Sequence, residues 1–330
     1  MSEAGLAARP APTRTGLRWD ALLRASLPWL VSIILLFWVF AGQDLGEILG
    51  SLASAHYGRF GLALACFLVI GLLLDSLFLY VSFRWLAQVG RFGELLRARA
   101  ATELLMLVTL LAGMGGIVVY ARKRYGLPVR DGTGLVLVDL LHEAAAIGAL
   151  ALLGVWIAAP GLEPSLRSDL LPIRDFALAV LGFYVLCVLA SFIGRRLPDR
   201  LQLDTPLLMF HRISLAHFGG FLLLKVVKNL AMGLFVVAGL ACFSVKPPVF
   251  IGVAMTQVVL LLRGLPVTAF GIGVDQVSIP TLFEPWQAAA NDSALLGFAA
   301  VFTFSLVAGR AVLGVPFVGG VLADLRREEG

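Results

Sequence analysis

The chain has 330 residues, of which 59% are hydrophobic and 14% are charged, and its mean hydropathy is +0.93. These values exclude an ordinary soluble domain, and the repeated long apolar runs indicate a polytopic helical membrane protein. The chain has no long polar segment that could form a separate soluble enzyme domain. The net charge of +5 is typical of basic cytoplasmic loops in a membrane protein, so it does not predict nucleic-acid binding.

The N-terminal part of the chain contains a polar tail, two apolar runs and a basic segment. Residues 1–24 are rich in Ala, Pro and Arg, and we expect a cytoplasmic tail there. Leu27–Ala41 is interpreted as an uncleaved first span, because no small-residue cleavage site closes it. Phe60–Phe83 is long enough for a second span and carries Asp75. The basic segment Arg91–Arg99 has the spacing of an amphipathic helix on the membrane surface.

A glycine-broken apolar segment comes next. Thr102–Tyr120 is interrupted around Gly113 and Gly116, and a cluster of positive charges lies directly after it, within residues 122–130. A full crossing would place this cluster outside, against the positive-inside rule. We therefore predict a re-entrant hairpin that returns to the cytoplasmic side.

The middle of the chain contains two further spans. Thr133–Ala159 is long enough to cross the membrane with some tilt, and Asp175–Gly194 forms the next crossing. Asp139 and Glu143 are spaced i,i+4 on the first of these helices, so they share one face. His142 lies beside this face and is interpreted as a hydrogen-bonded core residue.

The next apolar run, Ile213–Phe243, is longer than the ~20 residues that a span requires. It contains Lys225 and Lys228. Two interpretations fit: one steeply tilted span, or an interfacial helix followed by a separate span. In either case we expect the two lysines to extend towards an interface, where the ammonium groups reach water.

A second broken segment follows, between Val249 and Pro280. Val249–Leu262 is apolar but too short to span, and the chain is then interrupted at Pro266, Gly271 and Gly273. Irregular backbone at membrane depth is tolerated only where protein or a water-filled cavity covers it. A pair of broken helices among full spans is typical of a transporter site. The alternative is an ordinary loop between helices.

Ala294–Phe317 completes the membrane domain, which we assign to residues 25–320, with a short cytoplasmic tail at 321–330. Most Lys and Arg residues fall in segments that this topology places inside. The pattern predicts an all-α membrane protein with about six full spans, two re-entrant hairpins from opposite faces and both termini in the cytoplasm. Two such hairpins raise the possibility of an inverted repeat. The expected outer loops carry only Arg59, Arg167, Arg174 and Lys246.

Polar residues inside the apolar runs are the candidate substrate path. A charged side chain at the bilayer centre costs ~2.5–3.5 kcal/mol, so it faces either a cavity or a partner. The histidines and cysteines lack metal-binding spacing, so we expect neither a metal nor another cofactor. The candidates are Asp139, Glu143, Arg263, Asp275, Gln276 and Arg310, and the expected turn residues are Gly113, Gly116, Pro266, Gly271 and Gly273.

Three stretches resemble one known family, typified by the flippase domain of bacterial lysylphosphatidylglycerol synthases. Leu111–Arg124 is similar to its Pro-Gly-Arg-x-Gly-Asp/Glu-x-x-Arg turn, and Val136–Glu143 to its Glu-Arg-x-x-Asp helix. Leu265–Gln276 is similar to its Pro-x-x-x-Gly-Gly-x-Gly-x-x-Glu hairpin. The resemblance covers most of the membrane part. Four glycines and two acids match the family's pattern: Gly113, Gly116, Gly271, Gly273, Asp139 and Glu143. By contrast, Phe270 replaces a glycine, Leu140 an arginine and Gln276 a glutamate.

The resemblance implies a divergent, stand-alone lipid transporter, or flippase, that moves a polar-headgroup lipid across or within the bacterial inner membrane. Membrane lipids are the expected partners, with a homo-oligomer or a membrane enzyme as further options. A non-catalytic accessory subunit of a lipid- or glycan-modifying system is one alternative. A lipid-processing enzyme is another, although the sequence has no Ser-His-Asp pattern, paired Asp-x-x-Asp motif or Gly-rich phosphate loop.

Overall fold

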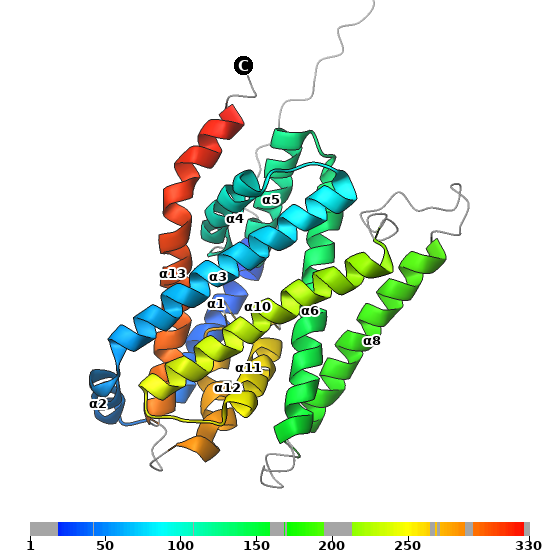
Figure 1. Ribbon diagram of the computed structural model, residues 1–330. Helices are drawn as coiled ribbons and strands as arrows, with labels where there is room; N and C mark the ends of the chain where they lie inside the picture. The colour runs from blue at the N-terminus through cyan, green and yellow to red at the C-terminus, as the bar shows by residue number, and fades with distance from the viewer. Residues whose placement is uncertain are drawn as a thin grey trace, which may run out of the picture.

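The computed structural model describes residues 19–41, 43–107, 109–158, 168, 170–194, 213–264, 268, 271–287 and 293–326. All regular elements in these residues are helices (Figure 1). Residues 1–18 of the expected tail and Pro266 lie outside the described residues. The helices run further towards both ends than expected, since the first begins at Trp19 and the last ends at Arg326.

Five helices are long and apolar enough to cross a membrane. An additional helix pair, α1 (Trp19–Phe40) and α2 (Leu45–Ser54), passes the same test together but bends by 95° at its break. The described residues therefore contain five helices of spanning length, or six if the bent pair forms one span. The five are α3 (Tyr57–Ser82, continued by the π-helical turn Phe83–Ala87), α6 (Val129–Ala158), α8 (Leu171–Gly194), α10 (Leu215–Cys242) and α13 (Ser293–Arg326).

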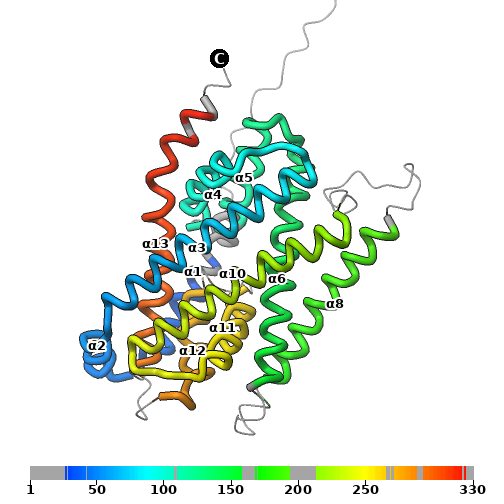
Figure 2. The backbone as a smooth tube through the Cα atoms, viewed as in Figure 1, coloured from blue at the N-terminus to red at the C-terminus, as the bar shows by residue number. Residues whose placement is uncertain are grey.

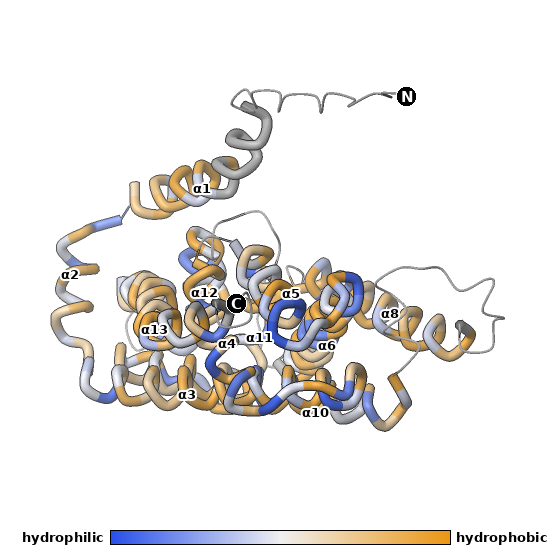
Figure 3. Tube along the Cα trace, turned by 90° about the horizontal axis from the view of Figure 1, so that it is seen from above, coloured by the Kyte–Doolittle hydropathy of each residue, from blue (hydrophilic) through white to orange (hydrophobic). Residues whose placement is uncertain are grey.

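Apolar side chains on the outside of the bundle suit these helices to a lipid environment. Phe183, Leu186 and Ile193 of α8 are all exposed, and hydrophobic residues predominate along the outer helices (Figure 3). Such large apolar surfaces are unfavourable in water but are well solvated by hydrocarbon. The helices also satisfy their own backbone hydrogen bonds, as a lipid environment requires.

The long run that contains Lys225 forms one unbroken helix. Ser214 caps the start of α10, because its hydroxyl accepts a hydrogen bond from the His217 amide, and His217 accepts one from the Ser214 amide in return. The prediction of one continuous helix is therefore confirmed, and the separate interfacial helix is wrong. The helices α3 and α10 lie side by side and cross the bundle obliquely (Figure 2).

The first hairpin consists of α4 (Phe92–Met106) and α5 (Leu110–Tyr125). The two helices are joined between Met106 and Leu110, where Thr109 caps α5 through a hydrogen bond from the Ala112 amide. Gly113 and Gly116 were expected at the turn, but both lie within α5. A Cβ atom on either glycine would clash with α4, at Met106 and Leu105 respectively. The glycines therefore permit close helix packing instead of breaking the helix.

The helix α4 is also not the surface helix that its basic sequence predicted. Leu95 and Ala98 are completely buried, and Arg99 is buried with them. The helix packs against α3, α5 and α13. The amphipathic interpretation was wrong because Arg99 has buried carboxylate partners on α3 and on α4 itself.

The second hairpin consists of α11 (Val249–Arg263) and α12 (Val274–Phe283), followed by the 3-10 turn η4 (Glu284–Trp286). Gly271 and Gly273 lie in the connection with φ angles of 77° and 93°. Residues with a Cβ atom rarely adopt such angles, so glycine suits both positions of this connection. Leu35 of α1 packs against Gly273.

Each hairpin packs against a long helix from the other half of the chain, an arrangement that we call the exchange of hairpins. Helix α6, which follows the first hairpin, packs against α11 of the second, and α13, which follows the second, packs against α4 of the first. In Figure 1 the pair α4–α5 occupies the upper part of the bundle and α11–α12 the lower part. The space between them contains the site described next.

Candidate functional site

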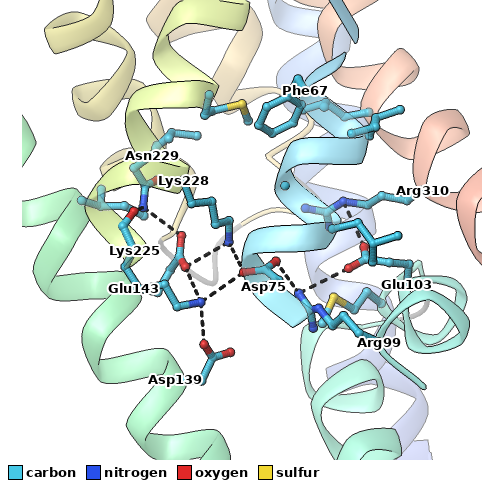
Figure 4. Close-up of a pocket in the computed structure, with 18 of the residues that line it drawn as sticks. Phe67, Asp75, Arg99, Glu103, Asp139, Glu143, Lys225, Lys228, Asn229 and Arg310 are labelled. Carbon is cyan, nitrogen blue, oxygen red and sulfur yellow. Dashed lines mark hydrogen bonds and ion pairs between the residues drawn. The ribbon is translucent and has the colours of Figure 1, made fainter. Parts of the chain in front are cut away.

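A cavity of about 290 Å³ lies between the two hairpins. Met106 and Met114 line it from the first hairpin, and Arg263 and Gly264 line it from the second. Side chains from α3, α6, α10 and α13 complete the wall (Figure 4). Both helix breaks therefore border the same internal space, although they are far apart in sequence.

Ion pairs between α6, α10 and α3 form one side of the cavity. Lys225 Nζ lies 2.5 Å from Asp139 Oδ1 and 2.9 Å from Glu143 Oε2. Lys228 Nζ lies 3.0 Å from both Glu143 Oε2 and Asp75 Oδ1. The amide of Asn229 donates a further hydrogen bond to Glu143 Oε1 at 3.1 Å.

The ion pairs continue across the cavity to α4 and α13. Arg99 Nη2 donates a hydrogen bond to Asp75 Oδ2 at 2.9 Å, and it lies 3.3 Å from Glu103 Oε1. The other oxygen of Glu103 lies 3.5 Å from Arg310 Nε. Figure 4 shows Asp75 between the two lysines and Arg99, as the link between both sides.

These residues form a chain of alternating charge, from the carboxylate of Asp139 to the guanidinium of Arg310. Helical spacing explains the arrangement, because Asp139 with Glu143, and Arg99 with Glu103, are i,i+4 pairs that share a face. This charge chain, as we call the row of ion-paired residues, is neutral in total, with four acids and four bases. Removing one partner of a buried pair leaves an uncompensated charge, so the members depend on one another. In order, the chain runs through Asp139, Lys225, Glu143, Lys228, Asp75, Arg99, Glu103 and Arg310.

The two lysines of α10 contradict the expectation that they extend to an interface. Lys225 is only 2% exposed and Lys228 is also largely enclosed. The Lys225 ammonium additionally lies 4.4 Å from the centre of the Phe78 ring, a favourable cation–π contact. Carboxylates on α3 and α6 replace water as the partners of these ammonium groups.

A second polar cluster anchors the tip of α12. Asp275 Oδ2 accepts a hydrogen bond from the Thr303 hydroxyl at 2.6 Å and lies 3.3 Å from Arg263 Nη1. Gln276 Oε1 accepts one from the Gly273 amide at 2.6 Å, and its Nε2 donates to the Ala299 carbonyl at 3.3 Å. These bonds hold the glycine turn against α13.

The predicted candidates therefore divide into two groups. Asp139, Glu143 and Arg310 belong to the charge chain, and Arg263 lines the cavity beside it. Asp275 and Gln276 are buried behind the cavity wall and position the α12 tip. Sequence reasoning left Asp75, Arg99, Glu103, Lys225, Lys228 and Asn229 out of the candidate set, although charges inside apolar runs are themselves a signal.

His142 belongs to the core and not to the cavity. Its Nδ1 lies 2.6 Å from the Val138 carbonyl oxygen, and its ring packs against Phe218, Phe221 and Tyr184. Across the described part of the chain, no group of three His, Cys, Asp or Glu side chains could hold a metal ion. The arrangement offers paired charges and space for polar groups.

No protein-family model matches the chain, and no curated protein shows significant similarity to it. The resemblance to the flippase domain of lysylphosphatidylglycerol synthases therefore stays a prediction. The cavity and its charges are therefore the features that indicate a function.

Proposed function

We propose that this protein is a transporter that moves a polar-headgroup lipid across or within the bacterial inner membrane. One observation supports this most directly: a charged cavity lies between the tips of two broken helix pairs, among helices of spanning length. Intramembrane charges are costly, and in transporters they mark the path of a polar substrate.

The exchange of hairpins between the halves supports an inverted repeat, with α3, α4–α5 and α6 corresponding to α10, α11–α12 and α13. In this arrangement the hairpins re-enter the membrane from opposite faces. The positive-inside rule then places the Arg122–Arg130 end of the bundle, and both termini, in the cytoplasm. Transporters with inverted repeats bind their substrate near the midplane at the repeat interface, where this cavity would lie.

In the proposed mechanism, the headgroup passes through the cavity while the acyl chains stay in lipid. The cavity is hydrophilic on the sides formed by Glu143, Lys228 and Arg310, and apolar at Phe67, Leu68 and Leu306. A headgroup that enters must exchange partners with the charge chain. Because the charge chain connects α3, α4, α6, α10 and α13, such an exchange of ion-pair partners would change how these helices are held together.

The direct test is lipid translocation in proteoliposomes that contain the purified protein. We would compare fluorescent lipids with anionic, zwitterionic and phosphate-free sugar headgroups against protein-free liposomes. We expect accelerated translocation of at least one lipid, and reduced translocation by Glu143→Gln, which weakens the contacts of Lys225 and Lys228. Arg174→Gln is the matched control, because Arg174 pairs with Asp175 on an exposed part of α8. Translocation at the protein-free rate for every lipid would refute the proposal.

A second candidate function is an accessory membrane subunit for a partner such as a lipid- or glycan-modifying enzyme. Both oxygens of the Glu143 carboxylate already have partners, in Lys225, Lys228 and Asn229. This observation favours an accessory subunit, because fully paired charges also hold a helix bundle together. If Glu143→Gln lowers thermal stability while translocation is unchanged, the charges are structural and the accessory role is preferred.

A further inference from the structure

The charge chain is tight at one end and loose at the other. Lys225 and Lys228 contact Glu143 at 2.9 and 3.0 Å, close to the ~2.7–2.9 Å of charge-assisted hydrogen bonds. Glu103, by contrast, lies 3.3 Å from Arg99 and 3.5 Å from Arg310. Two guanidinium groups thus hold this buried carboxylate only weakly.

The loose end also has hydrogen-bond donors without acceptors. Among the described residues, the buried Arg99 Nε has no hydrogen-bond partner. The buried Arg263 Nη1 makes no hydrogen bond either, although it lies 3.3 Å from Asp275 Oδ2 in an ion pair. Arg310 has the most exposed charged side chain of the cavity, at 40%. All three arginines line the same cavity. A buried donor without an acceptor is energetically costly, so this end is suited to a ligand rich in acceptor oxygens.

We propose that Arg99, Arg263 and Arg310 form a binding site for a phosphate-class anion, and that Glu103 is an internal competitor for the same arginines. Planar guanidinium groups bind tetrahedral oxyanions with paired hydrogen bonds. Phosphate oxygens supply more acceptors than one carboxylate, so they match the unused donors.

The size of the cavity agrees with a headgroup as the ligand. At ~30 Å³ for each water molecule, 290 Å³ corresponds to about ten waters. This space accommodates a phosphate and a few further atoms, but not the acyl chains of a lipid. For a lipid ligand the inference rests on the proposed function, and it names the class of headgroup as a phosphodiester.

Charge balance explains the role of Glu103. The charge chain is neutral, and Arg263 is balanced by Asp275, so a bound anion adds a negative charge that the cavity must compensate. Glu103 is the carboxylate whose contacts compete with the anion, and it gives up these contacts when the anion binds. Glu103→Gln removes the competing negative charge and should therefore strengthen anion binding.

The first experiment measures thermal unfolding of the full-length protein in detergent, by tryptophan fluorescence, with increasing inorganic phosphate. Chloride keeps the ionic strength constant. We expect saturable stabilisation, with an apparent affinity at least tenfold weaker in Arg310→Gln and several-fold tighter in Glu103→Gln. Arg174→Gln, which removes an arginine far from the cavity, should match the wild type.

The second experiment separates free phosphate from a lipid headgroup. Native mass spectrometry would compare binding of phosphatidylglycerol with that of a diacyl glycolipid without phosphate. Selective loss of phosphatidylglycerol binding in Arg310→Gln supports a lipid phosphate. A response to inorganic phosphate alone keeps the anion site but contradicts a lipid phosphodiester as its ligand.

Equal responses of wild type and Arg310→Gln to both probes overturn the anion site. Translocation of a phosphate-free lipid would in that case still uphold the proposed transport function. If Arg310→Gln does not fold, Arg310→Lys takes its place. It retains the charge but loses the planar pair of donors, so it should weaken phosphate binding, and unchanged binding would again overturn the site.

Discussion

Asp75 connects the two sides of the cavity. Its Oδ1 atom contacts Lys225 at 3.2 Å and Lys228 at 3.0 Å, while its Oδ2 atom accepts the hydrogen bond from Arg99. One carboxylate thus compensates cations on α10 and α4. A buried ion pair need not stabilise a fold relative to apolar residues, but loss of one partner is expensive.

We therefore expect Asp75→Asn to destabilise the protein strongly, by about 3–5 kcal/mol, the cost of leaving a buried charge without its partner. The measurement is the thermal unfolding midpoint in detergent. Asp175→Asn is the control, because Asp175 pairs with Arg174 on an exposed surface, where ion pairs contribute little. Equal midpoints for the two variants would show that the charge chain does not depend on Asp75.

A second residue-scale prediction concerns pH at the base of the first hairpin. Arg124 and Tyr125 donate hydrogen bonds to Glu94, each at 2.9 Å. The Arg124 hydrogen bond is the main reason that the pKa of Glu94 lies below its ordinary value of 4.5. A depressed carboxylate pKa contributes stability above the unfolded-state pKa, and this contribution is lost as the pH falls through the folded-state pKa.

Glu94→Gln should therefore lower the unfolding midpoint at pH 7, and the difference from wild type should shrink as the pH falls below about 4.5. The check is a series of unfolding curves for both proteins between pH 7 and pH 3.5. A constant difference across this range would mean that the Glu94 charge does not hold α4 to α5.

At the scale of elements, the two hairpins use glycine in different ways. Gly113 and Gly116 bring α5 close to α4, whereas Gly271 and Gly273 adopt backbone angles that form the turn before α12. The sequence predicted the second turn because Gly271 and Gly273 interrupt an apolar run, and glycine readily adopts the backbone angles of a turn. The first turn was misplaced because glycines at a contact between two helices cannot be distinguished in the sequence from glycines in a turn. Thr109, a good N-cap residue before an apolar run, was the signal for the correct position.

Gly273→Ala tests the turn. A left-handed backbone costs an L-residue about 1–2 kcal/mol, and the added Cβ would lie 2.6 Å from Leu35 Cβ of α1. We expect a lower unfolding midpoint together with impaired translocation. Gly182→Ala on α8 is the matched control, since a Cβ there meets open space and alanine favours the helix. A midpoint for Gly273→Ala as high as that of Gly182→Ala would contradict the strained turn.

At the scale of the whole molecule, the sequence predicted the helical class, the position of the second break and the shared face of Asp139 and Glu143. It did not predict which charges pair, because the partners lie far apart in the chain, as with Asp75 and Lys225. Hydropathy indicates that a charge in an apolar run needs a partner, but only the packing of α3 against α10 identifies it. Where one helix supplies both charges, as with Arg99 and Glu103, the i,i+4 spacing alone was enough to predict the pair.

Orientation in the membrane is testable through the ends of the bundle. Gly126 is exposed after α5, and Lys246 is exposed between α10 and α11. In a variant without Cys66, Cys187 and Cys242, we expect a cysteine at position 126 to react with a membrane-impermeant thiol reagent only after the cells are permeabilised. A cysteine at position 246 should react in intact cells. The reverse pattern would invert the proposed topology.

The exchange of hairpins between the halves has a consequence for biosynthesis. The helix α4 leaves the ribosome early, yet its packing partner α13 is the last helix to be made. Until α13 arrives, Glu103 lacks its contact with Arg310, and the first hairpin lacks one of its walls. Assembly of the early half is thus completed only at the end of translation, so insertases and proteases meet an unfinished bundle for most of the time that synthesis takes.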